Sequence, residues 1–208
     1  MDKKVQFIDF SQIHSNWYDK CKKDQSMILL DTDESRKYRS RRIPNEGDMI
    51  LENIIHTCTN MDNFSLYPYQ QDFIKTCLVP LFKFIYRGEW NKNRKQILQR
   101  NNVIGVYSEV LFKSPRRMGK TITLAIFCIA VASNINKDPT RPYHIAVFAT
   151  TQDASKRFID ECEIYWNLID KRHEFKFDRR AYMIIITNLK DQNDQRFIIA
   201  YCGSGAVS

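Results

Sequence analysis

Three consecutive residues in the second half of the chain have the types and the spacing needed to hold a phosphate. Gly119, Lys120 and Thr121 stand directly before an apolar stretch that predicts a helix. A glycine lets the backbone approach a phosphate closely, and the N–H groups of a helix N-terminus point toward an anion. The Lys120 ammonium group would neutralise charge on the outer phosphates of a nucleotide, and the Thr121 hydroxyl would be a ligand of Mg²⁺. The pattern therefore predicts a loop that binds ATP with Mg²⁺.

The residues before Gly119 depart from the usual loop. The complete candidate loop consists of Ser114, Pro115, Arg116, Arg117, Met118, Gly119, Lys120 and Thr121. The common motif is G-x-x-x-x-G-K-[ST], so Ser114 stands where a glycine is usual. A guanidinium group in the loop could stabilise the charge on a transferring phosphoryl group. The alternative is that both arginines pair with nearby acids.

The run from Ser114 to Thr121 resembles the deviant phosphate loop of the large terminase subunit, the ATPase that packages DNA in tailed phages and herpesviruses. The herpesvirus form is especially similar, because it shares Pro-Arg-Arg-x-Gly-Lys-Thr. The resemblance implies that an arginine of the loop senses the γ-phosphate and assists hydrolysis. Alignment back from Gly119 gives this role to Arg116, with Arg117 as the alternate, and makes Lys120 the second catalytic residue.

Other segments extend the resemblance to about residues 64–208. Tyr67-Pro-Tyr-Gln70 is similar to the adenine-recognition segment of the family, and the Gln70 side chain can both donate to and accept from an adenine edge. A helix N-terminal turn is the alternative interpretation. Residues 149–154 are similar to the family's polar strand end that opens a helix. Residues 199–208 are similar to the segment before its Walker B strand.

The carboxylates that a complete ATPase needs are missing after the loop. One acid should help to hold Mg²⁺ and a second should activate water, but the apolar runs end in Thr187 and Asn188 and in Cys202 and Gly203. A run ending in acids, residues 27–34, precedes the loop, which is the wrong order for the family. We therefore expect a fragment that lacks Walker B and the nuclease domain, with ATP hydrolysis belonging to a full-length protein.

The elements around the loop predict an α/β fold. The expected elements are a strand over 103–112, a helix over 120–133, a strand over 143–150, an amphipathic helix with apolar residues from Ala154 to Ile169, and strands over 181–188 and 196–201 joined by a turn at 191–194. This order favours a P-loop NTPase-like, mainly parallel sheet with helices on both faces, incomplete at its C-terminal side.

The region before the loop is less regular in sequence. Apolar residues from Phe73 to Ile85 have helical spacing, and Pro80 should kink or split that helix. Residues 88–102 are polar and predict a loop or an exposed helix. We divide the chain into an irregular N-terminal arm, 1–60, and the N-terminal part of a P-loop ATPase domain, 61–208.

Composition and charge restrict the function classes. The 208-residue chain has a net charge of +8, which favours nucleic-acid partners if the basic residues share one face. The basic cluster 36–42 is either a solvated surface, a nuclear import signal or a DNA contact. The six cysteines have no zinc-site spacing and indicate reduced thiols inside a cell. The N-terminus has no signal core, and the longest apolar run, 124–132, is far below the ~20 residues that span a bilayer.

Three functions remain open from the sequence. The first is the ATP-binding part of a motor that translocates viral DNA. The second is another P-loop enzyme, such as a helicase-like protein. The third is a non-catalytic module that binds DNA or packaging partners through a basic surface. The terminase resemblance implies viral double-stranded DNA, portal and small terminase proteins as partners, a homo-oligomer in the full-length motor and no membrane. It places a herpesvirus-like protein in the host nucleus, and otherwise in the host cytoplasm.

Overall fold

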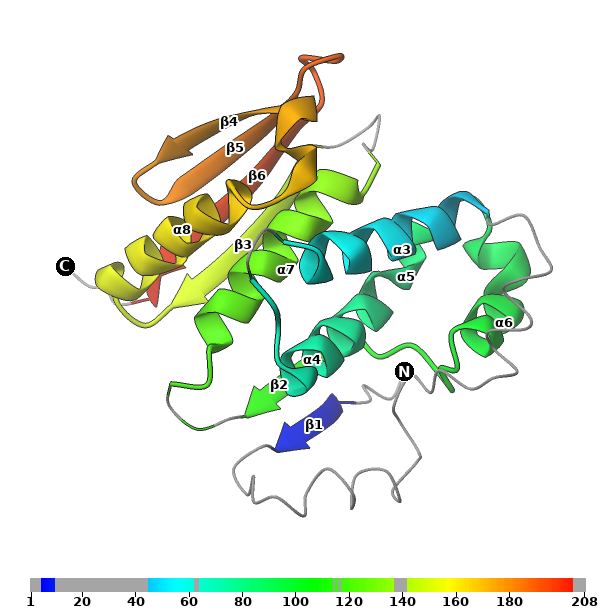
Figure 1. Cartoon of the computed structure of the whole chain (residues 1–208). Helices are drawn as coiled ribbons and strands as arrows, with labels where there is room; N and C mark the ends of the chain where they lie inside the picture. Colours follow the sequence, from blue (N-terminus) through cyan, green and yellow to red (C-terminus); the bar gives the residue numbers. More distant parts are fainter. Residues whose placement is uncertain are drawn as a thin grey trace. The chain divides into compact units, whose positions relative to one another are not determined.

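The computed structural model describes residues 5–9, 45–61, 64–113, 115, 117–136 and 142–203, with only the backbone given for 5–9 and for Lys171. The runs 27–34 and 36–42 and the residues 204–208 lie outside the described part. The chain divides into two compact units, whose helices and strands are labelled in Figure 1. Unit 1 contains residues 1–51 and 67–118, and unit 2 contains residues 52–66 and 119–208.

Unit 1 is mainly helical. Its elements are β1 (Val5–Asp9), the first part of α3 (Glu46–Thr59), α4 (Pro68–Leu78), η1 (Val79–Leu81), α5 (Phe82–Ile85), α6 (Trp90–Arg100) and β2 (Glu109–Lys113). The predicted interruption at Pro80 is confirmed, because the 3-10 turn η1 separates α4 from α5. Phe73, Ile74 and Phe82 on these short helices are buried in the core.

Two expectations for unit 1 need correction. The arm 1–60 is not irregular throughout, because residues 46–59 form α3, with Glu46 and Asp48 in the first turn, where acids complement the helix dipole. The strand expected over 103–112 is confined to β2, which pairs in parallel with β1 over five residues. Residues 103–108 are not strand, and Ile104 there is 84% exposed. Strand propensity without a pairing partner is insufficient to form a strand.

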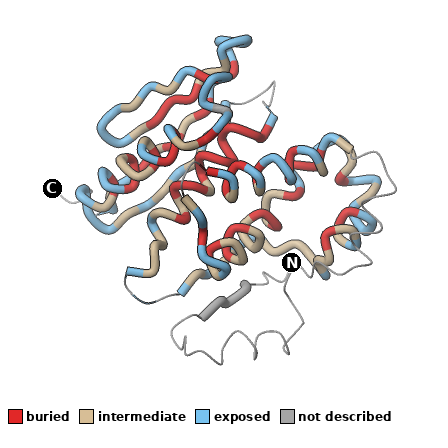
Figure 2. The backbone as a smooth tube through the Cα atoms, in the orientation of Figure 1, coloured by how far each residue is buried: buried red, intermediate tan, exposed pale blue. Residues whose placement is uncertain are grey.

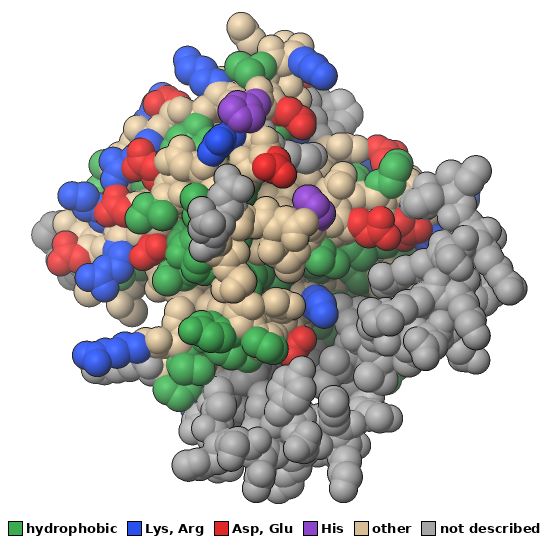
Figure 3. All heavy atoms as spheres, in the orientation of Figure 1, with side chains coloured by type: hydrophobic (Ala, Val, Ile, Leu, Met, Phe, Trp, Pro, Cys, Tyr) green, Lys and Arg blue, Asp and Glu red, His purple; other side chains and the backbone are tan. Residues whose placement is uncertain are grey.

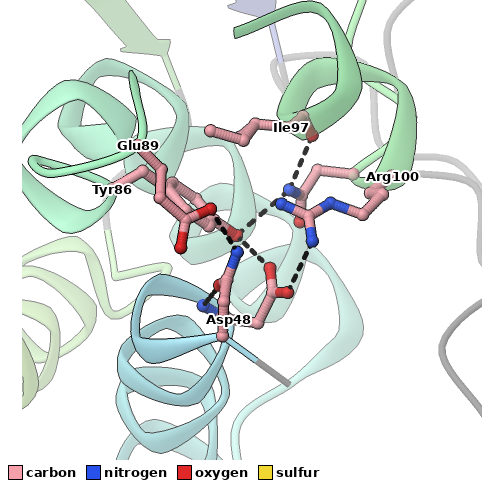
Figure 4. A network of polar contacts seen from close by, with 7 residues as sticks. Asp48, Tyr86, Glu89, Ile97 and Arg100 are labelled. Atoms are coloured by element: carbon pink, nitrogen blue, oxygen red, sulfur yellow. Dashed lines mark hydrogen bonds and ion pairs between the residues drawn. The ribbon is translucent and has the colours of Figure 1, made fainter. Parts of the chain in front are cut away.

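A polar network joins the beginning of α3 to the end of α6 (Figure 4). Asp48 accepts hydrogen bonds from the Tyr86 hydroxyl at 2.8 Å and from the Arg100 guanidinium at 2.9 Å. The buried Asn101 amide donates to the Tyr86 oxygen at 3.2 Å and to the Ile97 carbonyl at 2.9 Å. The network fixes the orientation of α6 within unit 1, because it anchors the C-terminal end of that helix.

Unit 2 contains the larger sheet. Its elements are the rest of α3, α7 (Lys120–Asn134), β3 (Tyr143–Ala149), α8 (Gln152–Trp166), η2 (Asp170–Glu174), β4 (Phe175–Arg180), β5 (Met183–Asn188) and β6 (Gln195–Cys202). The predictions for α7, β3, α8, β5 and β6 are confirmed to within a few residues, and β5 and β6 pair as the expected hairpin.

The four-stranded sheet is mixed, so the expectation of a mainly parallel sheet is wrong. Its order is β3-β6-β5-β4, in which β3 and β6 are parallel and the other two pairings are antiparallel. The two antiparallel pairings arise because short hairpin turns connect β4 to β5 and β5 to β6, and such turns reverse the direction of the chain. The α/β class itself is confirmed, since helices flank this sheet.

Helices α7 and α8 pack on the same face of the sheet. That face carries Ile184, Ile186 and Ile198, which are fully buried. Figure 2 shows α7 buried along most of its length. Arg196 on the same face pairs with Asp194 at 2.8 Å and donates to the Ala132 carbonyl of α7. The opposite face of the described sheet carries Phe148, which is 77% exposed, so the expectation of helices on both faces is not met there.

Candidate phosphate-binding loop

The loop residues join the two units, since the boundary falls between Met118 and Gly119. Pro115 and Arg117 in unit 1 are exposed, as is Thr121 in unit 2. Met118, Gly119 and Lys120 are of intermediate exposure. Ser114 and Arg116 lie outside the described residues.

The loop backbone turns sharply before α7. Arg117 and Gly119 both have a φ of 66°, in the left-handed region. A side chain costs about 1–2 kcal/mol in that region, and glycine avoids the cost. Alternation of left-handed residues near a helix start directs successive N–H groups into one concavity, which suits an anion. The strained conformation of Arg117 is the kind of outlier that accompanies binding sites.

The start of α7 is fixed by its own side chains and backbone. Gly119 is the N-cap, and its carbonyl accepts from the Thr123 N–H and from the Thr123 hydroxyl, both at 2.9 Å. Thr123 is fully buried, whereas Thr121 is exposed. In any α-helix the N–H groups of the first turn point out of the helix N-terminus and can bind an anion. The helix dipole adds positive potential at the same place.

The parallel strands of unit 2 end where α7 begins. The arrowheads of β3 and β6 point toward that end of the unit (Figure 1). Thr151 caps α8 there, with its hydroxyl oxygen accepting from the Ala154 N–H at 3.1 Å, and the Ser155 hydroxyl donates to the Tyr201 carbonyl at 3.1 Å. In α/β sheets, ligands bind outside the carboxyl ends of the parallel strands. The loop therefore enters unit 2 at the end of the sheet where ligands bind in such folds.

Within unit 1, the segment at residues 67–70 contacts the loop. The Tyr69 hydroxyl donates to the Met118 carbonyl at 3.0 Å, across 49 residues of sequence. Burial and the neighbouring Tyr67 raise the pKa of Tyr69, so its hydroxyl stays protonated and can donate. The Tyr67 ring, which is 67% exposed, stacks on Tyr69 with centroids 5.8 Å apart. The structure thus brings together two segments that the sequence had assigned to one site.

Gln70 has a structural role in this segment. It is 4% exposed, and its Oε1 accepts from the Tyr67 N–H at 2.9 Å at the start of α4. The Gln70 oxygen therefore has the role expected from the alternative interpretation, in which residues 67–70 form the N-terminal turn of a helix. The exposed aromatic surface of the segment belongs to Tyr67 instead.

Sequence reasoning missed two residues that shape the loop. Nothing in the spacing of Tyr69 indicated its hydrogen bond to the Met118 carbonyl. Thr123 left a usable signal, since it is a polar residue four positions after Gly119 and directly before the apolar run 124–132. At that spacing a threonine hydroxyl reaches the carbonyl one turn earlier.

Three cysteine thiols, the half-buried Cys77 and the buried Cys58 and Cys162, are poor candidates for a second reactive centre. Burial raises the pKa of Cys77 to about 12 and raises the pKa values of Cys58 and Cys162 as well. Thiols with raised pKa values are poor nucleophiles at neutral pH. No group of three or more His, Cys, Asp or Glu side chains in the described part is arranged to hold a metal ion.

Comparisons with known proteins identify no relative, so a proposal about function rests on the loop and on the fold. No protein-family model matches the chain, and searches of curated proteins and of solved structures give no significant match. Among the described residues, no helix has the length and apolar character to cross a membrane.

Proposed function

We propose that the loop at residues 114–121 binds the phosphates of Mg²⁺-ATP, and that the chain is the ATP-binding part of a terminase-like motor that translocates viral DNA into a capsid. The observation that carries the proposal is the conformation of Gly119. It takes the left-handed conformation at the N-cap of a buried helix, directly before Lys120 and Thr121. The P-loop NTPase-like character of the fold is part of this proposal.

The chemistry follows from the residues at the start of α7. Backbone N–H groups of the first turn bind phosphate oxygens, and the Lys120 ammonium group neutralises their charge. The exposed Thr121 hydroxyl would hold Mg²⁺ together with phosphate oxygens and water, since Mg²⁺ keeps several water ligands. The ion would be one that arrives with the nucleotide, because the described residues provide no cluster of acids for it.

The arginines of the loop have a separate role in the proposal. Arg116, or Arg117 as its alternate, would stabilise the charge that develops on the transferring phosphoryl group. The half-buried Tyr69 adjoins the loop through Met118, and the exposed Tyr67 ring stacked on it offers an aromatic surface to the base. In this proposal the tyrosine rings, more than the Gln70 oxygen, contact the adenine.

The biological setting is also proposed from the terminase resemblance. The partners would be viral double-stranded DNA and the portal and small terminase proteins, with homo-oligomer formation in the full-length motor. A herpesvirus-like protein would act in the host nucleus. A phage-like protein would act in the host cytoplasm.

Titration calorimetry of the full chain with Mg²⁺-ATP tests the proposal, with Lys120→Ala as the variant and the exposed Lys156→Ala as the matched control. We expect saturable binding in the wild type and in the control, and none in Lys120→Ala. Unchanged affinity in Lys120→Ala would refute the phosphate-loop interpretation.

Hydrolysis is tested separately. Because neither apolar run examined after the loop, 183–187 or 197–201, ends in the pair of acids that hydrolysis needs, we expect this chain to bind ATP without turnover. In a complete enzyme, Arg116→Ala should retain most of the binding and slow hydrolysis. A hydrolysis rate equal to that of the wild type would exclude Arg116 from the mechanism.

A further inference from the structure

Unit 1 contains a helix whose charges are all positive. Helix α6 carries Lys92, Arg94, Lys95 and Arg100 and has no acidic residue. Residues 82–100 together contain six Lys or Arg residues and one acid, Glu89, whose carboxylate accepts from Asn45 at 2.7 Å. The helix is therefore far more basic than the chain as a whole.

Three of these cations are available to a partner. Lys92, Arg94 and Lys95 are exposed, and the Arg94 guanidinium lies over the Trp90 ring at 5.6 Å from its centroid. Arg100 is different, because it binds Asp48 and only 19% of its side chain is exposed. We call Lys92, Arg94 and Lys95 the basic triad. Within the described part of unit 1, no ion pair neutralises it.

The basic triad is presented by an anchored element. Trp90 and Ile97 of α6 are buried, and the Asp48 network holds the C-terminal end of the helix (Figure 4). The backbone departs from helical geometry at Asn93, between the first and second residues of the triad. A rigid support reduces the entropy lost when a ligand is bound.

The arrangement is unfavourable for the isolated protein. Lys92 stands in the first turn of α6, where the helix dipole favours acids. Lys92 and Lys95 are three positions apart, a spacing at which like charges repel. A bound polyanion would relieve both effects. Helix α8 of unit 2 has no such imbalance, and acidic and basic side chains are interspersed over that side of the unit (Figure 3).

We infer that the basic triad binds the phosphate backbone of a nucleic acid. Exposed amides at Asn91, Gln96 and Gln99 stand around the triad and can donate to phosphate and sugar oxygens. A membrane surface fits less well, because Trp90 and Ile97 face the core and α6 offers no apolar face to lipid. This inference does not depend on nucleotide binding at the loop.

Fluorescence anisotropy with a labelled DNA duplex tests the inference on the full chain. The variant replaces Lys92, Arg94 and Lys95 by Gln. We expect its affinity to fall at least about tenfold, and the slope of log affinity against log salt to become shallower by about 2–3, since each lost phosphate contact removes ~0.9. The circular dichroism spectrum and the unfolding temperature should stay those of the wild type.

A charge-matched control separates the triad from net charge. Replacing the exposed Lys156, Arg157 and Lys176 of unit 2 by Gln removes the same charge and should leave most of the affinity. An equal loss in the control, or wild-type affinity in the triad variant, overturns the inference. So does triad-dependent binding to phosphatidylserine vesicles with unchanged DNA binding. The Lys120→Ala variant should bind DNA with the affinity of the wild type. A failure of the loop proposal can therefore be distinguished from a failure of this inference.

Discussion

Helices α7 and α6 present their binding groups in opposite ways. Helix α7 is apolar on nearly all sides and buried, so that only its N-terminal end, with Gly119, Lys120 and Thr121, is available to a ligand. Helix α6 buries Trp90 and Ile97 and exposes the three cations of the basic triad. A helix end offers a few directed N–H groups that suit one compact anion. A helix side offers dispersed charge that suits an extended one.

The largest expected effect tests the burial of α7. Ile129 is 1% exposed, so Ile129→Ala should lower the free energy of unfolding by about 2–5 kcal/mol through lost burial and a cavity. The matched change on the exposed side of α6, Gln96→Ala, should stay within about 0.5 kcal/mol. Chemical denaturation followed by circular dichroism measures both. Equal effects would mean that the two helices do not differ in burial as described.

The second test concerns the polar anchor of α6. Asp48→Ala leaves the Arg100 guanidinium and the Tyr86 hydroxyl without their acceptor, at a cost of about 1–3 kcal/mol. Burial and the adjacent Asp48 carboxylate raise the pKa of Tyr86, so its hydroxyl is protonated and donating at neutral pH. Asp178→Ala removes an exposed pair with Arg180 at 3.6 Å and should cost at most about 1 kcal/mol. A loss for Asp48→Ala no greater than that control would argue against the anchor.

The smallest effect on stability concerns the backbone at the start of α7. Gly119→Ala introduces a side chain at a φ of 66°, which should cost about 1–2 kcal/mol and weaken nucleotide binding. Gly105→Ala is the control, because no atom lies within 4 Å of the added Cβ. Thermal unfolding with and without Mg²⁺-ATP separates the two consequences. A Gly119→Ala protein as stable as the control would show that the left-handed conformation is dispensable.

The sequence predicted the elements of unit 2 better than their arrangement. Helices α7 and α8 and strands β3, β5 and β6 follow from long apolar or periodic runs, which are local signals. The mixed character of the sheet does not follow from local signals, because strand direction depends on pairing between residues that are far apart in sequence. Strand β4 alternates the half-buried Phe177 with charged residues and was missed, since a charged strand at the sheet edge has little apolar signal.

Unit 1 and helix α3, which the two units share, were harder to predict for two reasons. Helix α3 left a signal in the spacing of Ile50, Ile54 and Cys58, but its short apolar stripe follows a long polar region and was assigned to an irregular arm. The Asp48, Tyr86 and Arg100 network joins residues up to 52 positions apart, which no local pattern indicates. The candidate loop was found because its residues are contiguous. The contact of the loop with Tyr69 was not found, because the fold brings together two residues that lie 49 positions apart.

Amide hydrogen exchange of the full chain, with and without saturating Mg²⁺-ATP, tests the central claim most directly. We predict that nucleotide slows exchange in peptides covering residues 117–123, where backbone N–H groups would bind phosphate oxygens, and that Lys120→Ala abolishes this protection. Peptides covering α6 should exchange equally in both conditions. Unchanged exchange at residues 117–123 in nucleotide-saturated protein, or protection confined to other segments, would contradict the assignment of the loop.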